Sequence, residues 1–195
     1  LLRAERKNTK VAVMFIDLDH FKAVNDSLGH AYGDELLRNV SLRLQECVRK
    51  TDVVARLGGD EFTVLLNEVG DSGDVAFISK KILERLTASF TVAGHEIYVS
   101  ASVGISFYPD DGQNASVLIK NADAAMYAAK EQGRNNYQFF SAEMNAQALE
   151  ALMMASSLRL AIEREELVLE YQPRIDLEAG EVMGVEALVR WNHPN

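Results

Sequence analysis

The sequence is poor in the residues that cross-link or interrupt a chain. Its 195 residues include a single cysteine, three prolines and one tryptophan. One thiol cannot form an intramolecular disulfide or a cysteine-rich metal cage, so Cys47, which falls in an amphipathic helical pattern, is expected to be a packed thiol in a reducing compartment. No apolar run approaches the ~20 residues of a membrane span, and no signal-peptide pattern opens the chain. These absences predict a cytoplasmic protein.

Positive charge is also scarce. Lysine and arginine total 20 against 29 aspartates and glutamates, which gives a formal net charge of −9. This balance opposes general binding to nucleic acid or to an anionic membrane surface, so an anionic ligand must be met by a local cluster of donors. The length and the 48% hydrophobic content suffice for one good core and a tail.

Acidic residues follow apolar segments at two places. A run over residues 11–16 ends in Asp17 and Asp19, and a glycine-rich turn later in the chain presents Asp60 and Glu61. Carboxylates beside an apolar core are costly unless a cation neutralises them. Mg²⁺ takes oxygen ligands from one or two carboxylates, water and substrate phosphates. The pattern therefore predicts a divalent-metal site that serves a nucleoside triphosphate.

Hydrophobic periodicity alternates between strand and helix along the chain. Strands are predicted over residues 10–17, 53–57, 62–66 and 136–140, with a further strand pair around 90–107. Helices are predicted over residues 20–27, 33–49, 73–88 and 115–131. Gly58-Gly59 is expected to form the two-residue turn of the hairpin between 53–57 and 62–66. This order predicts an α+β fold, with helices packed on a sheet and one hairpin near the site.

Six motifs in order resemble a GGDEF domain, over roughly residues 8–140. They lie at residues 15–22, 25–26, 29–34, 56–62, 102–106 and 122–135. Members of that family are typically diguanylate cyclases, which condense two GTP molecules into cyclic di-GMP and release pyrophosphate. The resemblance implies a nucleotide-cyclase-like (ferredoxin-like) fold, with a mostly antiparallel central sheet flanked by helices.

The resemblance also implies roles for the acidic residues. Asp17, the main-chain carbonyl of Leu18 and Asp60 match the family positions that hold Mg²⁺ or Mn²⁺ on the triphosphate. Glu61 is expected to help with the second metal or to deprotonate the attacking 3′-hydroxyl. The alternative is that these residues are ordinary turn acids at strand ends, which the pairing of Asp17 with Asp60 on one rim disfavours.

Phosphate-binding groups are expected at two helix ends. The backbone amides of His20, Phe21 and Lys22 open a predicted helix, whose N-terminus favours an anion, and they match phosphate-binding amides of the family. Lys130 and Arg134 lie four residues apart at another helix end, and they match basic residues that contact the triphosphate. The alternative for this pair is complementation of the helix dipole.

Asn25 and Asp34 resemble the residues that read guanine in the family. A carboxylate can accept hydrogen bonds from the two adjacent donors on the Watson–Crick edge of guanine, while an amide pairs at another edge. Taken in isolation, both residues would also pass for helix caps.

Arg49 and Asp52 fit an R-x-x-D site at which many cyclases of this family bind cyclic di-GMP as feedback. Arginine can clamp phosphate and stack on a purine, and aspartate can accept hydrogen bonds from guanine. The motif alone is weak, because an arginine that ends a helix and an aspartate that leads a strand are common on solvated surfaces.

The tail differs from the rest of the chain. Residues 141–165 are rich in alanine, methionine and glutamate, which predicts a linker helix. Residues 166–195 resemble the start of an EAL domain, a cyclic di-GMP phosphodiesterase family in which the glutamate that matches Glu186 is a metal ligand. An EAL barrel needs ~250 residues, so this incomplete segment is not expected to be a phosphodiesterase by itself. The GGDEF domain itself is expected over residues 1–140.

The opening residues Leu1 to Lys7 depart from the D-x-L-T-G-L-x-N-R segment with which family members usually begin. That segment helps to wall the nucleotide cleft, so nucleotide binding by this chain is expected to be weakened. We interpret the chain as an excised piece of a GGDEF–EAL signalling protein from bacteria. In the family the sensory N-terminal region is often membrane-bound or ligand-sensing.

Three functions fit these residues. The first is a Mg²⁺-dependent diguanylate cyclase that works as a transient homodimer, in which each copy supplies one GTP. The second is a catalytically silent GTP-binding module that regulates a neighbouring EAL domain. The third is a cyclic di-GMP receptor that uses Arg49 and Asp52. The expected partners are GTP, cyclic di-GMP and a second copy of the chain, with no nucleic acid or membrane.

Overall fold

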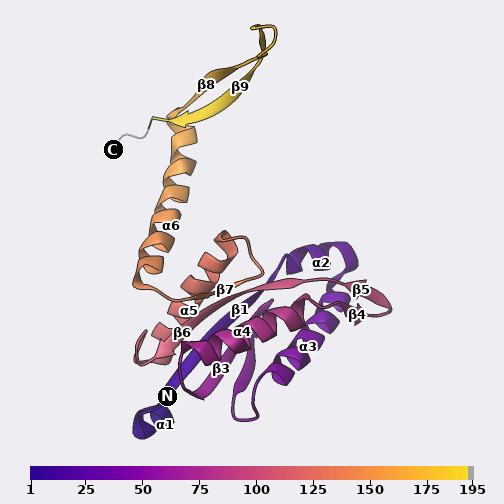
Figure 1. The fold of residues 1–195 in the computed structure, drawn as a ribbon, viewed down its shortest axis with the longest axis vertical. Helices are drawn as coiled ribbons and strands as arrows, with labels where there is room; N and C mark the ends of the chain where they lie inside the picture. Colours follow the sequence, from indigo (N-terminus) through magenta and orange to yellow (C-terminus); the bar gives the residue numbers. More distant parts are fainter. Residues whose placement is uncertain (193–195) are drawn as a thin grey trace. The chain divides into compact units, whose positions relative to one another are not determined.

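The computed structural model describes residues 1–192, apart from the side chains at 147–149 and 151–152. Contacts divide the chain into two units, Leu1–Ala146 and Gln147–Asn195. The first unit is a sheet with helices on both faces (Figure 1). Its elements are α1 (Leu2–Lys7), β1 (Lys10–Asp19), α2 (Phe21–Leu28), α3 (His30–Cys47), β2 (Val53–Gly58), β3 (Glu61–Val69), α4 (Ser72–Thr87), β4 (Phe90–Val92), β5 (His95–Ile97), β6 (Ser100–Tyr108), α5 (Ala115–Glu131) and β7 (Tyr137–Phe139).

The main sheet has the strand order β2-β3-β1-β6-β7. Its pairs are antiparallel except for β6 and β7, which run parallel. Strand β1 lies at the centre and is buried from Val11 to Asp19, because helices cover both of its faces. The predicted α+β fold with a mostly antiparallel sheet is therefore confirmed.

Helices α3 and α4 cover one face of the sheet and α5 covers the other. The larger core joins alternate residues of β1 such as Met14 and Ile16 to the apolar stripes of α3 and α4, and it includes Cys47. Cys47 is a buried free thiol, and burial raises its pKa. On the opposite face α5 approaches β6 so closely that a Cβ atom on Gly104 would lie 1.9 Å from the carbonyl oxygen of Ala122. This close approach requires glycine and fixes α5 against the sheet.

Several predicted boundaries were wrong. Helix α3 begins at His30, not at residue 33, because it starts directly after the break at Gly29. The hairpin turn is Gly59-Asp60 instead of Gly58-Gly59, because a bulge between Arg56 and Gly58 leaves Gly58 paired with Glu61. The predicted strand pair around 90–107 is three strands, of which β4 and β5 form a separate small sheet. Helix α1 has no counterpart among the predicted elements.

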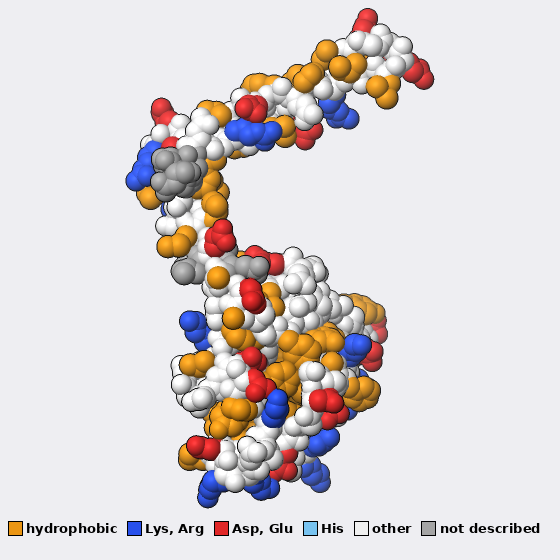
Figure 2. All heavy atoms as spheres, turned by 60° about the vertical axis from the view of Figure 1, so that its left-hand side comes forward, with side chains coloured by type: hydrophobic (Ala, Val, Ile, Leu, Met, Phe, Trp, Pro, Cys, Tyr) orange, Lys and Arg blue, Asp and Glu red, His pale blue; other side chains and the backbone are white. Residues whose placement is uncertain are grey.

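The second unit contains part of α6 (Ala142–Glu163) and a hairpin of β8 (Leu167–Ile175) and β9 (Val182–Trp191). The helix agrees with the predicted linker helix. At the end of the hairpin away from its turn, Trp191 Nε1 donates a hydrogen bond of 3.0 Å to Glu166 Oε2. Met183 and Val185 are among its exposed hydrophobic residues. Figure 2 shows hydrophobic side chains along the surface of this hairpin. None of the described helices is long and apolar enough to cross a membrane.

Candidate active site

The two predicted acidic clusters meet at one end of the sheet. Strands β1 and β3 are antiparallel neighbours, and their register places Asp17 opposite Glu61. The Leu18 N–H donates to the carbonyl oxygen of Asp60 at 3.4 Å, which attaches the 59–60 turn to β1. The four residues Asp17, Leu18, Asp60 and Glu61 therefore form one group, which we call the acidic rim.

Electrostatics in the acidic rim disfavours the charged forms of Asp17 and Glu61. Burial raises the pKa of Asp17, and the charge of Asp60 adds to this effect, although Lys130 works against it. Burial also raises the pKa of Glu61, with further contributions from Asp17, Asp123 and Asp60. Lys130 offsets only part of this repulsion, through an ion pair of 2.8 Å between its Nζ and Asp17 Oδ1. An additional cation would therefore stabilise the charged forms of these carboxyl groups.

The donor set suits Mg²⁺ or Mn²⁺. Within residues 1–192 no three or more His, Cys, Asp or Glu side chains gather closely enough to hold a metal ion. Mg²⁺ needs fewer protein ligands than that, because it usually takes one or two carboxylates and fills its other coordination positions with water and phosphate oxygens. Asp17, Asp60 and the Leu18 carbonyl would supply such a set. The residues present thus fit a metal that binds together with a triphosphate.

Asp123 on α5 is a carboxylate near the rim that the sequence reasoning missed. Its charge raises the pKa of Glu61, and its own pKa is raised by partial desolvation. The available signal was spacing, because Asp123 precedes Lys130 by seven residues. Two helical turns place both side chains on the same face of α5.

Helix α2 starts immediately after β1 with its N-terminus next to the acidic rim in sequence. His20 is the N-cap residue in a left-handed conformation, with φ 59°, and its side chain makes no capping hydrogen bond. Phe21 is buried, whereas His20 and Lys22 are exposed. The helix start predicted from the sequence is confirmed, and phosphate binding by these amides stays a prediction.

Asn25 and Asp34 lie on the adjacent helices α2 and α3, and neither is a helix cap. The N-cap residues are His20 and Gly29, which removes the capping alternative. The Asn25 Oδ1 atom is buried and has no hydrogen-bond partner within residues 1–192. It occupies the space beside Gly33, where a Cβ atom would lie 2.0 Å from it. Asn25 is therefore packed against Gly33 at the junction of α2 and α3, and guanine recognition by Asn25 and Asp34 stays a prediction.

Lys130 and Arg134 are placed differently from the prediction. Lys130 is in the last turn of α5 and faces Asp17, so its main contact is the acidic rim rather than the helix dipole. Arg134 lies beyond the helix, which ends at Glu131, and has φ 61° in the following turn. Lys130 and Arg134 therefore do not share one helix face, contrary to the prediction, although both lie near the end of α5.

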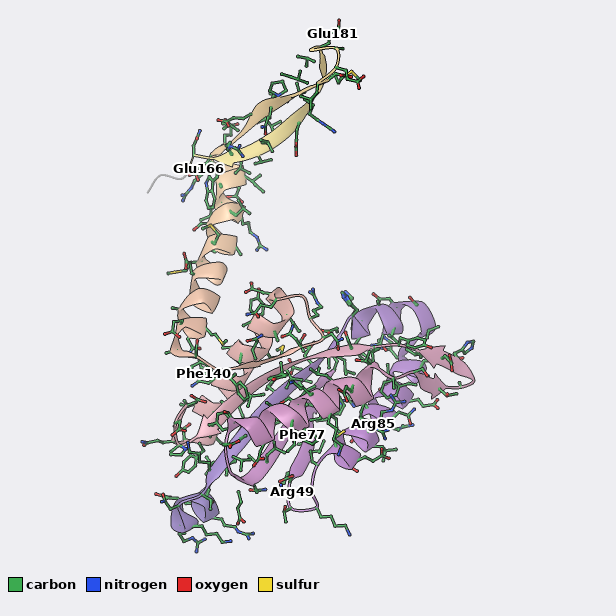
Figure 3. All side chains as sticks on the ribbon, viewed as in Figure 1. Arg49, Phe77, Arg85, Phe140, Glu166 and Glu181 are labelled. Carbon is green, nitrogen blue, oxygen red and sulfur yellow. The ribbon has the colours of Figure 1, made fainter. Side chains whose placement is uncertain are left out.

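Arg49 and Asp52 lie in the loop between α3 and β2, at the opposite end of β2 from the 59–60 turn (Figure 3). Both carboxylate oxygens of Asp52 accept backbone hydrogen bonds, from Arg49 N at 2.9 Å and Asn67 N at 3.0 Å. Arg49 is exposed and borders a surface pocket of about 390 Å³ with Gln45 and Lys50. Asp52 therefore organises the turn from which the Arg49 side chain extends.

Glu186 lies outside this unit. It is an exposed residue of β9, opposite Gln172 of β8. Its predicted role as an EAL metal ligand stays a prediction.

Comparison with known families agrees with this arrangement. Residues 1–136 match the family model described as "Diguanylate cyclase, GGDEF domain". The chain belongs to the GGDEF family. Residues 155–195 match the EAL domain model, as predicted for the tail.

Two relatives of this GGDEF chain come from Pseudomonas aeruginosa. The "bifunctional diguanylate cyclase/cyclic di-GMP phosphodiesterase MucR" is 50% identical over 98% of this chain and 28% of its own length. The "cyclic di-GMP phosphodiesterase NbdA" is 46% identical over 94% of this chain and 23% of its own length. The chain thus spans about a quarter of these curated relatives.

A solved structure shares the fold. The crystal structure of the GGDEF domain of YfiN (TpbB) from Pseudomonas aeruginosa superposes with a TM-score of 0.70 and 38% sequence identity. The superposition covers 72% of this chain and 88% of that chain. This likeness confirms the predicted GGDEF-type cyclase fold.

Proposed function

We propose that the chain is the diguanylate cyclase part of a GGDEF–EAL signalling protein and condenses two GTP molecules into cyclic di-GMP. The observation that carries this proposal is the acidic rim, in which Asp17, Asp60 and Glu61 come together with one lysine beside them. Residues 1–140 would form this domain, 141–165 the linker helix and 166–195 the start of the EAL domain.

In the proposed site each residue has a separate task. Asp17, the Leu18 carbonyl and Asp60 would hold Mg²⁺ or Mn²⁺, which supplies charge neutralisation for the triphosphate when bound. The backbone amides at the start of α2 would bind phosphate oxygens, with Lys130 and Arg134 as cationic partners. The exposed Asp34 carboxylate would accept hydrogen bonds from the Watson–Crick edge of guanine, and the side-chain amide of Asn25 would pair at another edge.

The reaction needs two copies of the chain. Each copy binds one GTP, and the 3′-oxygen of each attacks the α-phosphorus of the other. An oxygen–phosphorus bond forms as the bond from that phosphorus to the pyrophosphate leaving group breaks. Glu61 would receive the proton of the 3′-hydroxyl, or would contribute to metal binding. Positioning and charge stabilisation account for most of the catalysis in such phosphoryl transfers.

A second function is favoured by one of the relatives. NbdA is described only as a phosphodiesterase, although it matches 94% of this chain. This relative supports a GTP-binding module that regulates an adjacent EAL domain without turnover. Arg49 at its surface pocket supports a further role in cyclic di-GMP binding.

Product analysis separates these functions. The chain is incubated with GTP and Mg²⁺ at a series of protein concentrations, and nucleotides are resolved by liquid chromatography and mass spectrometry. We expect cyclic di-GMP and pyrophosphate, at a rate that rises more steeply than in proportion to protein concentration because two copies react. GTP binding without product at every concentration would support the regulatory module and reject the cyclase. The Asp60→Ala variant serves as the inactive control.

A further inference from the structure

Asp19 is a buried carboxylate to which neither the motif comparison nor the proposed reaction gives a role. Only 3% of the residue is exposed. Its side chain accepts hydrogen bonds from Ser100 Oγ at 2.6 Å and Ser102 Oγ at 2.7 Å on β6, and from Asn135 N at 3.2 Å. A buried carboxylate is costly unless its oxygens are satisfied, so these donors are needed to keep it there. Asp19 thus links β1 and β6 to the turn after α5.

That turn has an unusual backbone. Gly133, Arg134 and Asn135 are consecutive residues with positive φ angles, of 104°, 61° and 47°. Glycine adopts this conformation freely and asparagine tolerates it, whereas for arginine the left-handed region is disfavoured. The surrounding structure must therefore hold Arg134 in place.

Hydrogen bonds from several elements supply this support. Arg134 N and Asn136 Nδ2 both donate to the carbonyl oxygen of Ala129 in α5, at 3.2 and 2.8 Å. Thr87 Oγ1 at the end of α4 donates to Asn135 Oδ1 at 3.2 Å. These contacts join the turn to two helices. The hydrogen bond from Asn135 N to Asp19 joins the turn to β1, the strand that carries Asp17.

The position of Arg134 relative to the acidic rim is therefore fixed in part by Asp19, beside a hydrogen bond of 3.0 Å from Val103 N on β6 to the carbonyl oxygen of Asn136. Asp17 and Asp19 are two residues apart in β1, so their side chains lie on the same face of the sheet. Lys130 reaches Asp17, and the turn that carries Arg134 reaches Asp19. We propose that Asp19 is a positioning residue that holds Arg134 toward the triphosphate, an inference that rests on the proposed GTP site.

Two substitutions at Asp19 test this proposal. Asp19→Asn keeps the shape and can still accept from Asn135 N, but it loses the charge assistance of the hydrogen bond. Asp19→Ala removes the acceptor. The matched control is Asp111→Asn, because Asp111 also accepts from a backbone amide, Phe107 N at 2.7 Å, but in the turn after β6. If Asp19→Ala does not fold, Asp19→Asn decides the test.

The first readout needs no nucleotide. Hydrogen–deuterium exchange of the backbone over residues 132–136 is compared between the wild-type chain and the variants. We expect faster exchange in Asp19→Asn and no change there in Asp111→Asn. Unchanged exchange in both Asp19 variants would overturn the proposal, whatever the nucleotide measurements show.

The second readout is binding of the non-hydrolysable analogue with a methylene between the α- and β-phosphates, measured by calorimetry with Mg²⁺. We expect Asp19→Asn to weaken binding about five-fold and Asp19→Ala about ten-fold or more. Binding of GMP, which lacks the phosphates that Arg134 would contact, should not change. In an Arg134→Ala background the Asp19 substitutions should have no further effect, because coupled residues are not additive.

The failure of this inference differs from the failure of the proposed function. If the wild-type chain does not bind the analogue, the GTP site itself is rejected, and the positioning role falls with it. If the wild-type chain binds but Asp19→Asn and Asp19→Ala bind equally well, only the positioning role is rejected. A loss that is the same size in the Arg134→Ala background would also reject it, because Asp19 would then act on the fold in general.

Discussion

The ammonium group of Lys130 lies 2.8 Å from Oδ1 of Asp17, the carboxylate that we propose as a metal ligand. Both groups are largely shielded from solvent, with exposed side-chain fractions of 27% for Lys130 and 12% for Asp17. Burial raises the pKa of Asp17, and the ion pair with Lys130 offsets part of this rise. A divalent cation that binds Asp17 must therefore displace Lys130 or share the Asp17 carboxylate with it. A bound triphosphate would give Lys130 an alternative partner.

We predict that Lys130→Met strengthens Mn²⁺ binding in the absence of nucleotide. Removal of the ammonium leaves Asp17 without its competing cation, so the metal meets a freer carboxylate. With the triphosphate analogue present, the same variant should bind nucleotide more weakly because a phosphate contact is lost. Electron paramagnetic resonance of free Mn²⁺ measures the first effect, and calorimetry measures the second.

Lys120→Met, an exposed lysine of the same helix, is the matched control and should change neither quantity. Weaker Mn²⁺ binding in nucleotide-free Lys130→Met would contradict the competition between lysine and metal.

We predict that Gly33→Ala reduces the preference for GTP over ATP. A methyl group at this position would lie 2.0 Å from Asn25 Oδ1, so the asparagine side chain must move away. The wild type should prefer GTP by ~1.5–3 kcal/mol, because ATP leaves the acceptors of Asn25 and Asp34 unsatisfied. Calorimetric titration with GTP and ATP analogues gives the preference.

The stability of Gly33→Ala should change little. Alanine favours a helix over glycine by up to about 1 kcal/mol, and this gain offsets the cost of displacing the Asn25 side chain. Gly184→Ala is the control, since open space surrounds Gly184 in β9. Equal affinity of the wild-type chain for GTP and ATP analogues would show that these residues do not read guanine.

We predict that Asp111→Asn stabilises the protein at neutral pH. Burial raises the pKa of Asp111, with a further increase from Asp110, although the Phe107 amide and Lys10 lower it. Above the ordinary carboxyl pKa, the folded protein therefore binds more protons than the unfolded chain, and its stability falls as the pH rises through this window. A neutral amide avoids this cost. Thermal unfolding should show a higher midpoint at pH 7 and no gain near pH 4.

Glu68→Gln should act in the opposite direction. The hydrogen bond and charge of Lys7 lower the pKa of Glu68, so its charged form is favoured in the folded protein. Replacement by glutamine should therefore lower the unfolding midpoint at neutral pH, to a small extent because the pair is exposed. For Asp111→Asn, an unfolding midpoint below that of the wild-type chain at pH 7 would contradict the conclusion that burial disfavours the charged form of Asp111.

The sequence predicted the parts of the site that depend on local patterns. Asp17 follows an apolar strand and Asp60 follows a glycine pair, so both could be placed at strand ends without knowledge of the fold. The order of the motifs then indicated the family and the sheet. The hairpin register was wrong because a bulge depends on pairing between strands, which periodicity within one strand does not report.

The missed features depend on how α5 packs. Asp123 comes near Glu61, and Lys130 reaches Asp17, because α5 crosses the sheet in close contact at Gly104. The positive φ of Arg134 and its link to Asp19 are likewise set by contacts between distant segments. Sequence spacing alone predicts that Arg134 shares a helix face with Lys130, whereas α5 ends at Glu131 and Arg134 lies in the turn beyond it.

We predict that Arg49 binds cyclic di-GMP. If Arg49 contributes to a feedback site, cyclic di-GMP should bind an Asp60→Ala variant, because Asp60 lies at the other end of β2. The Arg49→Ala substitution in that background should abolish the binding. A charge-assisted contact between arginine and phosphate is among the stronger polar contacts, and an open surface pocket has little to replace it. Calorimetry with cyclic di-GMP measures the loss.

Arg49 is a better test of this site than Asp52. Both oxygens of Asp52 accept backbone hydrogen bonds, so Asp52→Ala would remove two contacts that shape the turn and would confound the measurement. The Arg49 side chain is exposed, so its truncation should preserve both the fold and GTP binding. Equal affinity for cyclic di-GMP in the Asp60→Ala variant with and without Arg49→Ala would reject the feedback site. The role of Asp52 would then be only to shape the turn before β2.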